Sequence, residues 1–216
     1  MTKTKIIGLA QVKGGAGRST VATNLAGELA RFHDVLLIDC DLPQGTSASW
    51  AELRREAGKA GRLRANTATD HRDLVAKVEY LRDTADYIIL DGPPRLAEMS
   101  RAILAMADLC LVPVGASAAE VWATSDLLKL IEDAKKIRKV DARLIWTRFR
   151  AYTRIAQELA EEADKALQLP ALKAILGYRV AYAEALGQGK TAAEMGDPEA
   201  RNEVVGMVAE IRRIMR

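Results

Sequence analysis

A glycine-rich segment of the chain reads Lys13-Gly14-Gly15-Ala16-Gly17-Arg18-Ser19-Thr20. It follows a short apolar run, residues 6–10, and precedes a segment whose apolar residues recur at helical spacing. Glycines at a junction between strand and helix let backbone N–H groups surround a phosphate, and the helix N-terminus adds its dipole and free donors. A hydroxyl at Ser19 is suitably placed to ligate Mg²⁺. The segment therefore predicts a phosphate-binding loop in preference to a turn without a ligand.

Around this loop, short apolar runs alternate with amphipathic segments. The runs are residues 6–10, 35–38, 87–90, 109–112 and 144–146, and the helical patterns follow Thr20 or cover about 46–59, 70–82 and 117–138. Continuous apolar runs are typical of parallel strands that are covered on both faces. The alternation predicts an α/β fold, with a doubly wound, mostly parallel β-sheet flanked by helices.

Beyond Arg150 the pattern becomes mostly helical. Ile155, Leu159 and Ala163 mark one expected helix, and a last helix starts near Pro198 with the apolar residues Val204, Val208, Ile211 and Met215. A length of 216 residues and a hydrophobic fraction of 49% suit a single domain, residues 1–216. We find no repeat and no linker between domains.

Composition excludes several other classes of protein. No apolar run approaches the ~20 residues that span a bilayer, and Met1 to Lys5 lack the apolar region of a secretory signal. Only two cysteines, Cys40 and Cys110, are present, so neither a disulfide framework nor a four-cysteine zinc site is possible. We therefore expect a cytoplasmic protein.

Three aspartates follow buried strands near the predicted loop. Asp39 and Asp41 come just after residues 35–38, and Asp91 ends residues 86–91 before a Gly-Pro-Pro turn. Carboxylates at such strand ends hold Mg²⁺ or orient an attacking water beside bound phosphates. The alternatives are an Asx turn for the first pair and a helix cap for Asp91.

These segments resemble the ParA/MinD family of ATPases. The loop is similar to that family's deviant Walker A motif, K-G-G-x-G-K-[ST], with Arg18 in place of the second lysine. Residues 39–45 look like its D-x-D-P-Q-G segment with Leu42 inserted, and residues 86–94 look like its D-Y-I-I-[IL]-D-x-P-P. Residues 109–117 followed by 121–123 resemble the V-P-V-x-P-S…D-V-W-A of small plasmid-partition ParA proteins, apart from Ala116 and Glu120. The resemblance covers nearly the whole chain and implies a P-loop NTPase fold of the deviant Walker A type.

The resemblance implies an ATPase that uses ATP and Mg²⁺ and forms a nucleotide-sandwich homodimer. Lys13 would reach the phosphates of the partner subunit, Asp41 would position water, and Ser19, Asp41 and Asp91 would form the metal shell. Nucleotide would contact Lys13, Gly14, Gly15, Ala16, Gly17, Arg18, Ser19, Thr20 and Thr147. Thr147 replaces an asparagine that contacts the base, and threonine lacks the paired amide groups. Hydrolysis would be slow and stimulated by DNA and a ParB-like adaptor, in order to position plasmid DNA or a protein cargo such as carboxysomes.

Charge is concentrated in one segment. Residues 135–154 hold eight bases and one acid, a net +7, which leaves −4 for the rest of a chain whose total is +3. Such a segment attracts a phosphate backbone without reading its sequence, although a solvated helix face is the usual fate of a charge run. The loop begins at residue 13, so we expect no preceding sequence-reading motif and only nonspecific, nucleoid-associated DNA binding. The DNA-binding candidates are Arg148, Arg150, Arg154, Lys173 and Arg179.

Three other functions compete with this interpretation. Arg18, Leu42 and Thr147 also suit a nucleotide-binding regulator with little or no hydrolysis. The basic end of the last helix allows a MinD-like, membrane-associated positioning ATPase, but that helix has acids and lacks Phe and Trp, so a helix docked on the sheet is favoured. A metabolic ligase with the same loop type, related to dethiobiotin synthetase, is disfavoured by the basic segment.

Overall fold

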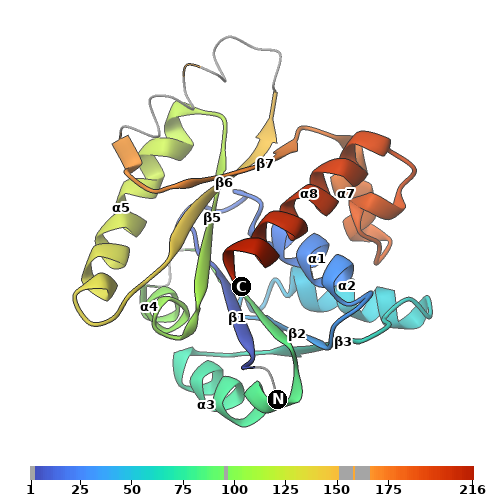
Figure 1. Ribbon diagram of the computed structural model, residues 1–216, viewed down its shortest axis with the longest axis horizontal. Helices are drawn as coiled ribbons and strands as arrows, with labels where there is room; N and C mark the ends of the chain where they lie inside the picture. The colour runs from blue at the N-terminus through green and yellow to red at the C-terminus, as the bar shows by residue number, and fades with distance from the viewer. Residues whose placement is uncertain (1–2, 95–96, 151–157, 159–165) are drawn as a thin grey trace.

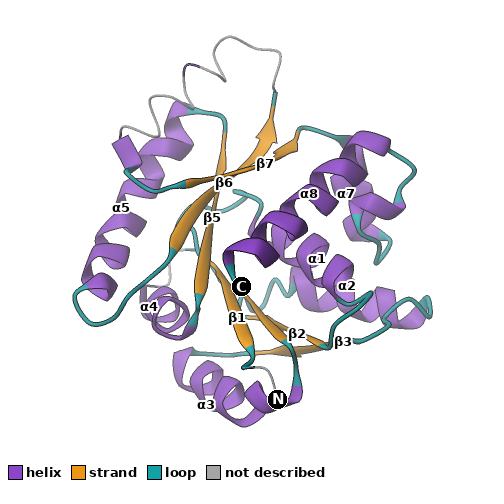
Figure 2. Ribbon diagram, in the orientation of Figure 1, coloured by secondary structure: helices purple, strands orange, loops and turns teal. Residues whose placement is uncertain are grey.

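In the computed structural model, which describes residues 3–94, 97–150, 158 and 166–216, seven strands form one sheet. Their order is β3-β2-β4-β1-β5-β6-β7, and all the paired strands are parallel (Figures 1 and 2). The strands are β1 Lys5–Leu9, β2 Val35–Asp39, β3 Leu63–Thr67, β4 Tyr87–Asp91, β5 Leu109–Gly115, β6 Ala142–Phe149 and β7 Ala171–Gly177. The predicted doubly wound α/β fold is confirmed.

Helices cover both faces of this sheet (Figure 1). They are α1 Arg18–Leu29, α2 Thr46–Glu56, α3 His71–Leu81, α4 Ala97–Met106, α5 Ala118–Lys135, α7 Val180–Gly187 and α8 Pro198–Ile214, with short 3₁₀ turns η1 Arg82–Thr84 and η2 Ala192–Glu194. Successive strand residues point to opposite faces. Accordingly Ile7 and Leu37 pack with α1, α2, α7 and α8, whereas Ile6 and Leu36 pack with α3 and α4. This double coverage explains why the central strands are continuous apolar runs.

Two edge strands and one helix were missed by the sequence prediction. β3 and β7 lie at the two edges of the sheet and are partly exposed, so neither contains a long apolar run. The helix α4 falls where no helix was predicted. The expected helix around Ile155, Leu159 and Ala163 falls outside the described residues.

The last helix, α8, begins and packs as the sequence predicts. Asp197 accepts hydrogen bonds from the backbone N–H groups of Glu199 and Ala200, and Pro198 opens the first turn. Its apolar face, including Val204 and Ile211, is buried against α1 and β7. Within the part of the chain that is described, no helix has the length and apolarity needed to cross a bilayer.

Candidate nucleotide site

The glycine-rich loop lies between the carboxyl end of β1 and the start of α1. Gly15 and Gly17 have φ angles of +75° and +94°, a region that side chains with a Cβ rarely adopt. Gly17 is the N-cap of α1, and no side chain of the described residues caps that helix. The first-turn N–H groups of α1 are thus left for another acceptor, as a phosphate site requires.

Two aspartates come together beside this loop because of the strand register. Asp91 of β4 is paired with Leu9 of β1 on one side and with Asp39 of β2 on the other. Both carboxylates are fully buried, and burial, followed by the charge of Asp39, raises the pKa of Asp91 to about 7. Neither oxygen of Asp91 has a hydrogen-bond partner among the described residues. The hydroxyl groups of Ser19 and Ser47 still lie near enough to lower that pKa.

An orphaned buried carboxylate next to a serine hydroxyl fits a Mg²⁺ shell. Within the described residues there is no cluster of three or more His, Cys, Asp or Glu side chains able to hold a metal ion. A cation here would take most of its ligands from hydroxyl, water and phosphate oxygens. That is the usual pattern for Mg²⁺ bound with a nucleotide. The predicted metal residues Ser19 and Asp91 therefore lie together.

Asp39 and Asp41 have different tasks in the structure. Asp39 accepts hydrogen bonds of 2.9 Å from the backbone N–H groups of Asp41 and Ala48, and so shapes the segment that carries Asp41. Asp41 is partly exposed, and its pKa is raised by burial while the charge of Arg18 opposes that rise. The additional residue Leu42 precedes Pro43 through a cis peptide bond and is 39% exposed.

Arg18 is turned into the protein, under the loop. Its Nε donates to the carbonyl of Gly92 at 2.7 Å, and its Nη1 donates to the carbonyls of Gln11 at 2.6 Å and Lys13 at 2.8 Å. Nη2 lies 4.0 Å from an oxygen of Asp41. The side chain is only 6% exposed, and burial lowers its pKa. Arg18 thus links the segment that leads into the loop, at Gln11 and Lys13, to the turn after β4, at Gly92.

Thr147, at the carboxyl end of β6, supports the same loop. Its hydroxyl donates to the carbonyl of Ala16 at 2.8 Å, and the residue is buried. A Cβ on Gly17 would lie only 3.2 Å from Thr147, which explains why glycine fits there. The hydroxyl proton of Thr147 is therefore already used within the protein.

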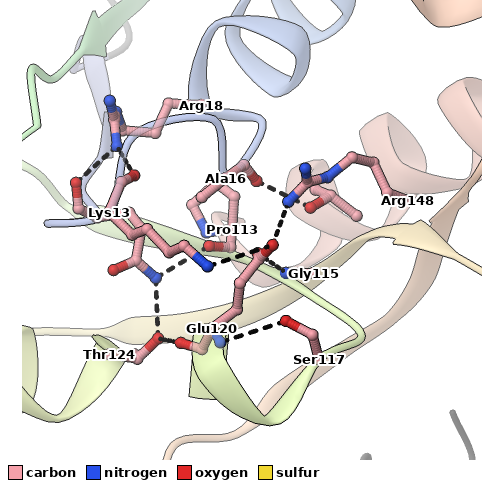
Figure 3. A network of polar contacts seen from close by, with 11 residues as sticks. Lys13, Ala16, Arg18, Pro113, Gly115, Ser117, Glu120, Thr124 and Arg148 are labelled. Carbon is pink, nitrogen blue, oxygen red and sulfur yellow. Dashed lines mark hydrogen bonds and ion pairs between the residues drawn. The ribbon is translucent and has the colours of Figure 1, made fainter. Parts of the chain in front are cut away.

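Lys13 belongs to a polar network centred on Glu120 of α5 (Figure 3). Its ammonium nitrogen is 3.9 Å from Oε1 of Glu120, and the same oxygen is 2.5 Å from Arg148. The other oxygen, Oε2, accepts a 2.6 Å hydrogen bond from the backbone N–H of Gly115. Sequence reasoning noted Glu120 only as a departure from a motif and missed this contact. An acid three residues after the N-cap Ser117 was the available signal.

A pocket of about 410 Å³ opens beside the loop. This volume is in the range of small-molecule sites. Its walls come from the loop, from the end of β6 and from the β7–α7 region. The lining residues are Gly15, Gly17, Thr20, Thr147, Arg148, Leu176, Gly177, Tyr178, Arg179, Val180, Tyr182, Ala183 and Leu186.

Comparison with known proteins agrees with this geometry. Residues 7–192 match the model of the CobQ/CobB/MinD/ParA nucleotide binding domain. The chain belongs to this family. The family resemblance found in the sequence is thereby confirmed, and with it the P-loop fold.

Individual relatives in the family include positioning and partitioning proteins. The chain is 30% identical to the chromosome-partitioning ATPase Soj of Thermus thermophilus, covering 89% of this chain and 88% of Soj. It is 28% identical to the maintenance of carboxysome distribution protein A of Halothiobacillus neapolitanus, covering 88% and 87%. The fold matches the ATP complex of a variant of McdA from Cyanothece with a TM-score of 0.82, at 20% identity and 98% coverage of both chains.

The candidate DNA-binding residues differ in the contacts that their side chains make within the protein. Arg148 pairs with Glu120, and the guanidinium of Arg150 lies 4.7 Å from the ring centre of Tyr178. Arg154 falls outside the described residues. Arg179 contacts two glutamates of α8 at 2.6 and 2.8 Å, which raise its pKa, and Lys173 is exposed.

The described part of the basic segment, residues 135–150, does not form one face. Arg143 lies at the start of β6 and Arg148 near its end, about 17 Å away at ~3.3 Å per residue. Lys135, Lys136 and Arg143 are also paired with nearby acids, two of which lie before residue 135 in α5. The net charge of +7 counted along the sequence therefore does not form a single surface, because β6 carries Arg143 and Arg148 toward opposite ends of the strands.

Proposed function

We propose that this protein is a switch ATPase that binds ATP and Mg²⁺ at the glycine-rich loop and then forms a nucleotide-sandwich homodimer. The observation that carries the proposal is the convergence of the uncapped start of α1 with the orphaned carboxylate of Asp91. The first suits phosphate oxygens and the second suits a hard cation. Membership of a nucleotide-binding family that includes Soj supports the same function.

Each residue of the site has a defined task in this proposal. Ser19 and Asp91 hold Mg²⁺, which neutralises phosphate charge when bound. Asp41, partly exposed at the rim, orients the attacking water. Lys13 leaves Glu120 and reaches the phosphates of the partner subunit. The pocket beside the loop takes the nucleoside, with Thr147 supporting the loop.

The cycle that we propose positions a cargo. The ATP dimer binds DNA nonspecifically through Lys173, Arg150, Arg154, Arg148 and Arg179, and a ParB-like adaptor stimulates hydrolysis and release. The relatives named for chromosome partitioning and carboxysome distribution support plasmid DNA or a protein assembly as cargo. The protein would then be cytoplasmic, and on the nucleoid when ATP is bound.

Measurements of phosphate release and of dimer formation together test the proposed ATPase. Wild-type protein with ATP and Mg²⁺ should run as a dimer in size-exclusion chromatography and release phosphate slowly. Asp41→Asn should keep the dimer and abolish release. Asp34→Asn, an exposed carboxylate at the opposite edge of the sheet, is the matched control and should behave as wild type. Release by Asp41→Asn at the wild-type rate would contradict the role of Asp41.

DNA binding needs a separate experiment. In a filter-retention assay, ATP and Mg²⁺ should increase retention of duplex DNA of any sequence. Lys173→Gln should reduce it, whereas Lys129→Gln, also exposed, should not. If nucleotide has no effect on retention, DNA positioning is refuted while the ATPase proposal stands.

One observation favours a second candidate, a nucleotide-binding switch with little hydrolysis. Three hydrogen bonds to carbonyl groups hold the Arg18 side chain in one place and use its Nε and Nη1 donors within the protein. A lysine in its place is a compact, movable charge. Arg18→Lys should therefore raise turnover if the arginine limits hydrolysis. An unchanged rate would leave the main proposal in place and remove this one.

A further inference from the structure

A second hollow lies at the amino-terminal edge of the sheet, at the opposite ends of the strands from the glycine-rich loop. Its volume is about 610 Å³, within the range of small-molecule sites. This hollow is here called the amino-edge pocket. It is lined by Lys3, Lys5, His33, Asp86, Tyr87, Ala209, Arg212, Arg213 and Arg216. They come from the start of β1, the turn after α1, the start of β4 and the end of α8.

The amino-edge pocket has a strong excess of positive charge. Five cations face one carboxylate, a net +4 with His33 neutral. That carboxylate, Asp86, already accepts a 3.0 Å hydrogen bond from the backbone N–H of Asp34 and lies 3.7 Å from Nδ1 of His33. Cations gathered around a hollow raise the local potential and attract anions.

Most of these cations are not neutralised by the protein itself. Within the described residues, no ion pair involves Lys5, Arg212, Arg213 or Arg216, and Lys3 approaches Asp108 only to 3.9 Å. Lys5 lies over the ring of Tyr87, with its ammonium 5.9 Å from the ring centre. The guanidinium groups of Arg212, Arg213 and Arg216, which are all exposed, are therefore the donors available to a ligand.

The helix dipole alone does not explain this arrangement. Arginines in the last turn of α8 interact favourably with the negative end of that helix. The dipole gives no reason for Lys3 and Lys5, which belong to the first strand, to line the same hollow. Burial of Val208 and Ile211 fixes the end of α8 at this edge and brings the two groups of cations together.

We propose that the amino-edge pocket binds a small anion that carries two or more phosphate groups. Cations from two sides of a hollow match a compact oligophosphate, whereas a duplex backbone is convex and would contact only the exposed rim. Arginine and lysine donors and the phosphate charge together give charge-assisted hydrogen bonds. The pocket is separate from the nucleotide site, because β1 and β4 run between them for about 13 Å at ~3.3 Å per residue.

Calorimetric titration with inorganic tripolyphosphate tests the proposal. The full chain is used without Mg²⁺ and without nucleotide, because ADP itself carries two phosphate groups and would compete for the amino-edge pocket. Any uptake of the probe by the glycine-rich loop is common to the wild type and both double variants. At the amino-edge pocket, Arg212→Gln/Arg213→Gln should bind tripolyphosphate about 100-fold more weakly than wild type, since two charged hydrogen-bonding groups are lost. The control, Arg72→Gln/Arg201→Gln, removes the same charge from exposed positions elsewhere and should retain wild-type affinity.

Two further competition experiments identify the source of the phosphate groups. A duplex oligonucleotide and vesicles with anionic phospholipid should not displace tripolyphosphate from the wild type. Displacement by either one that depends on Arg212 and Arg213 would overturn the assignment to a small anion. Equal tripolyphosphate affinity in the two double variants would overturn the site itself. Circular dichroism should show that both variants are folded. Since the ATP-dependent function uses other residues, its failure would leave this result unaffected.

Discussion

Replacing Arg18 by lysine tests whether the arginine stabilises the glycine-rich loop. The guanidinium donates three hydrogen bonds of 2.6–2.8 Å to buried carbonyl groups. A lysine ammonium is a single donor centre, so it can keep one or two of them but cannot bridge all three carbonyls. Each lost bond from a charged donor costs about 1.5 kcal/mol or more. Desolvation does not offset that cost, because an ammonium is more strongly hydrated than a guanidinium.

The net expectation is a loss of about 2 kcal/mol in the free energy of unfolding. For a chain of this size, that loss lowers Tm by roughly 4–8 °C. The assay is thermal unfolding followed by circular dichroism, without nucleotide. Arg72→Lys, an exposed residue of α3, is the matched control and should move Tm by less than about 2 °C.

Salt gives a second readout of the same contacts. Because the Arg18 hydrogen bonds are buried, the difference between the variant and wild type should persist at about 0.5 M NaCl. A Tm for Arg18→Lys within the range of the control would refute the reasoning. It would mean that the three carbonyl contacts do not stabilise the folded chain in solution.

Three other predictions concern the same side of the molecule. Without Mg²⁺, stability should fall as pH rises from about 4 to 7, because native Asp91, with a pKa raised to about 7, keeps a proton that the unfolded chain releases near ~4. The urea midpoint of Asp91→Asn should lack that component of the fall, and parallel pH curves would contradict it. Thr147→Val removes the hydrogen bond to Ala16 and should cost about 1–2 kcal/mol in urea unfolding, with a Thr147→Ser variant close to wild type. Gly8→Ala places a Cβ on the buried strand β1 in overlap with the side chain of Ile103, and it should lower the free energy of unfolding by about 1–3 kcal/mol. Unchanged stability of this variant would contradict the prediction.

The sequence was sufficient for the centre of the fold and for the position of the loop. Central strands are buried on both faces, so their apolar runs are continuous and easily recognised. β3 was missed because Arg64 and Ala65 are exposed, and a half-exposed edge strand has no such run. The convergence of Asp39 and Asp91 with the loop could be anticipated, since parallel strands present their carboxyl ends at one edge.

Side-chain partners were beyond the reach of the sequence. Arg18 was expected near phosphates, but its contacts with Gly92 depend on a turn 74 residues away. Glu120 joins Lys13 and Arg148 only because α5 begins beside the end of β6, which no local pattern encodes. The basic segment was misjudged for the same reason, because distance along a strand is not visible in a charge count.

The strand order has a consequence for how the chain can be made. β1 pairs only with β4 and β5, so a nascent chain released through residue 67 can join β2 to β3 but leaves β1 with no neighbour. The gap closes when residues 87–91 emerge and insert between β1 and β2. That same insertion delivers Asp91. On the ribosome, the first strand therefore stays unpaired, and the glycine-rich loop unsupported, until later residues emerge. The sheet is then joined, and the metal carboxylate brought into place, in a single event.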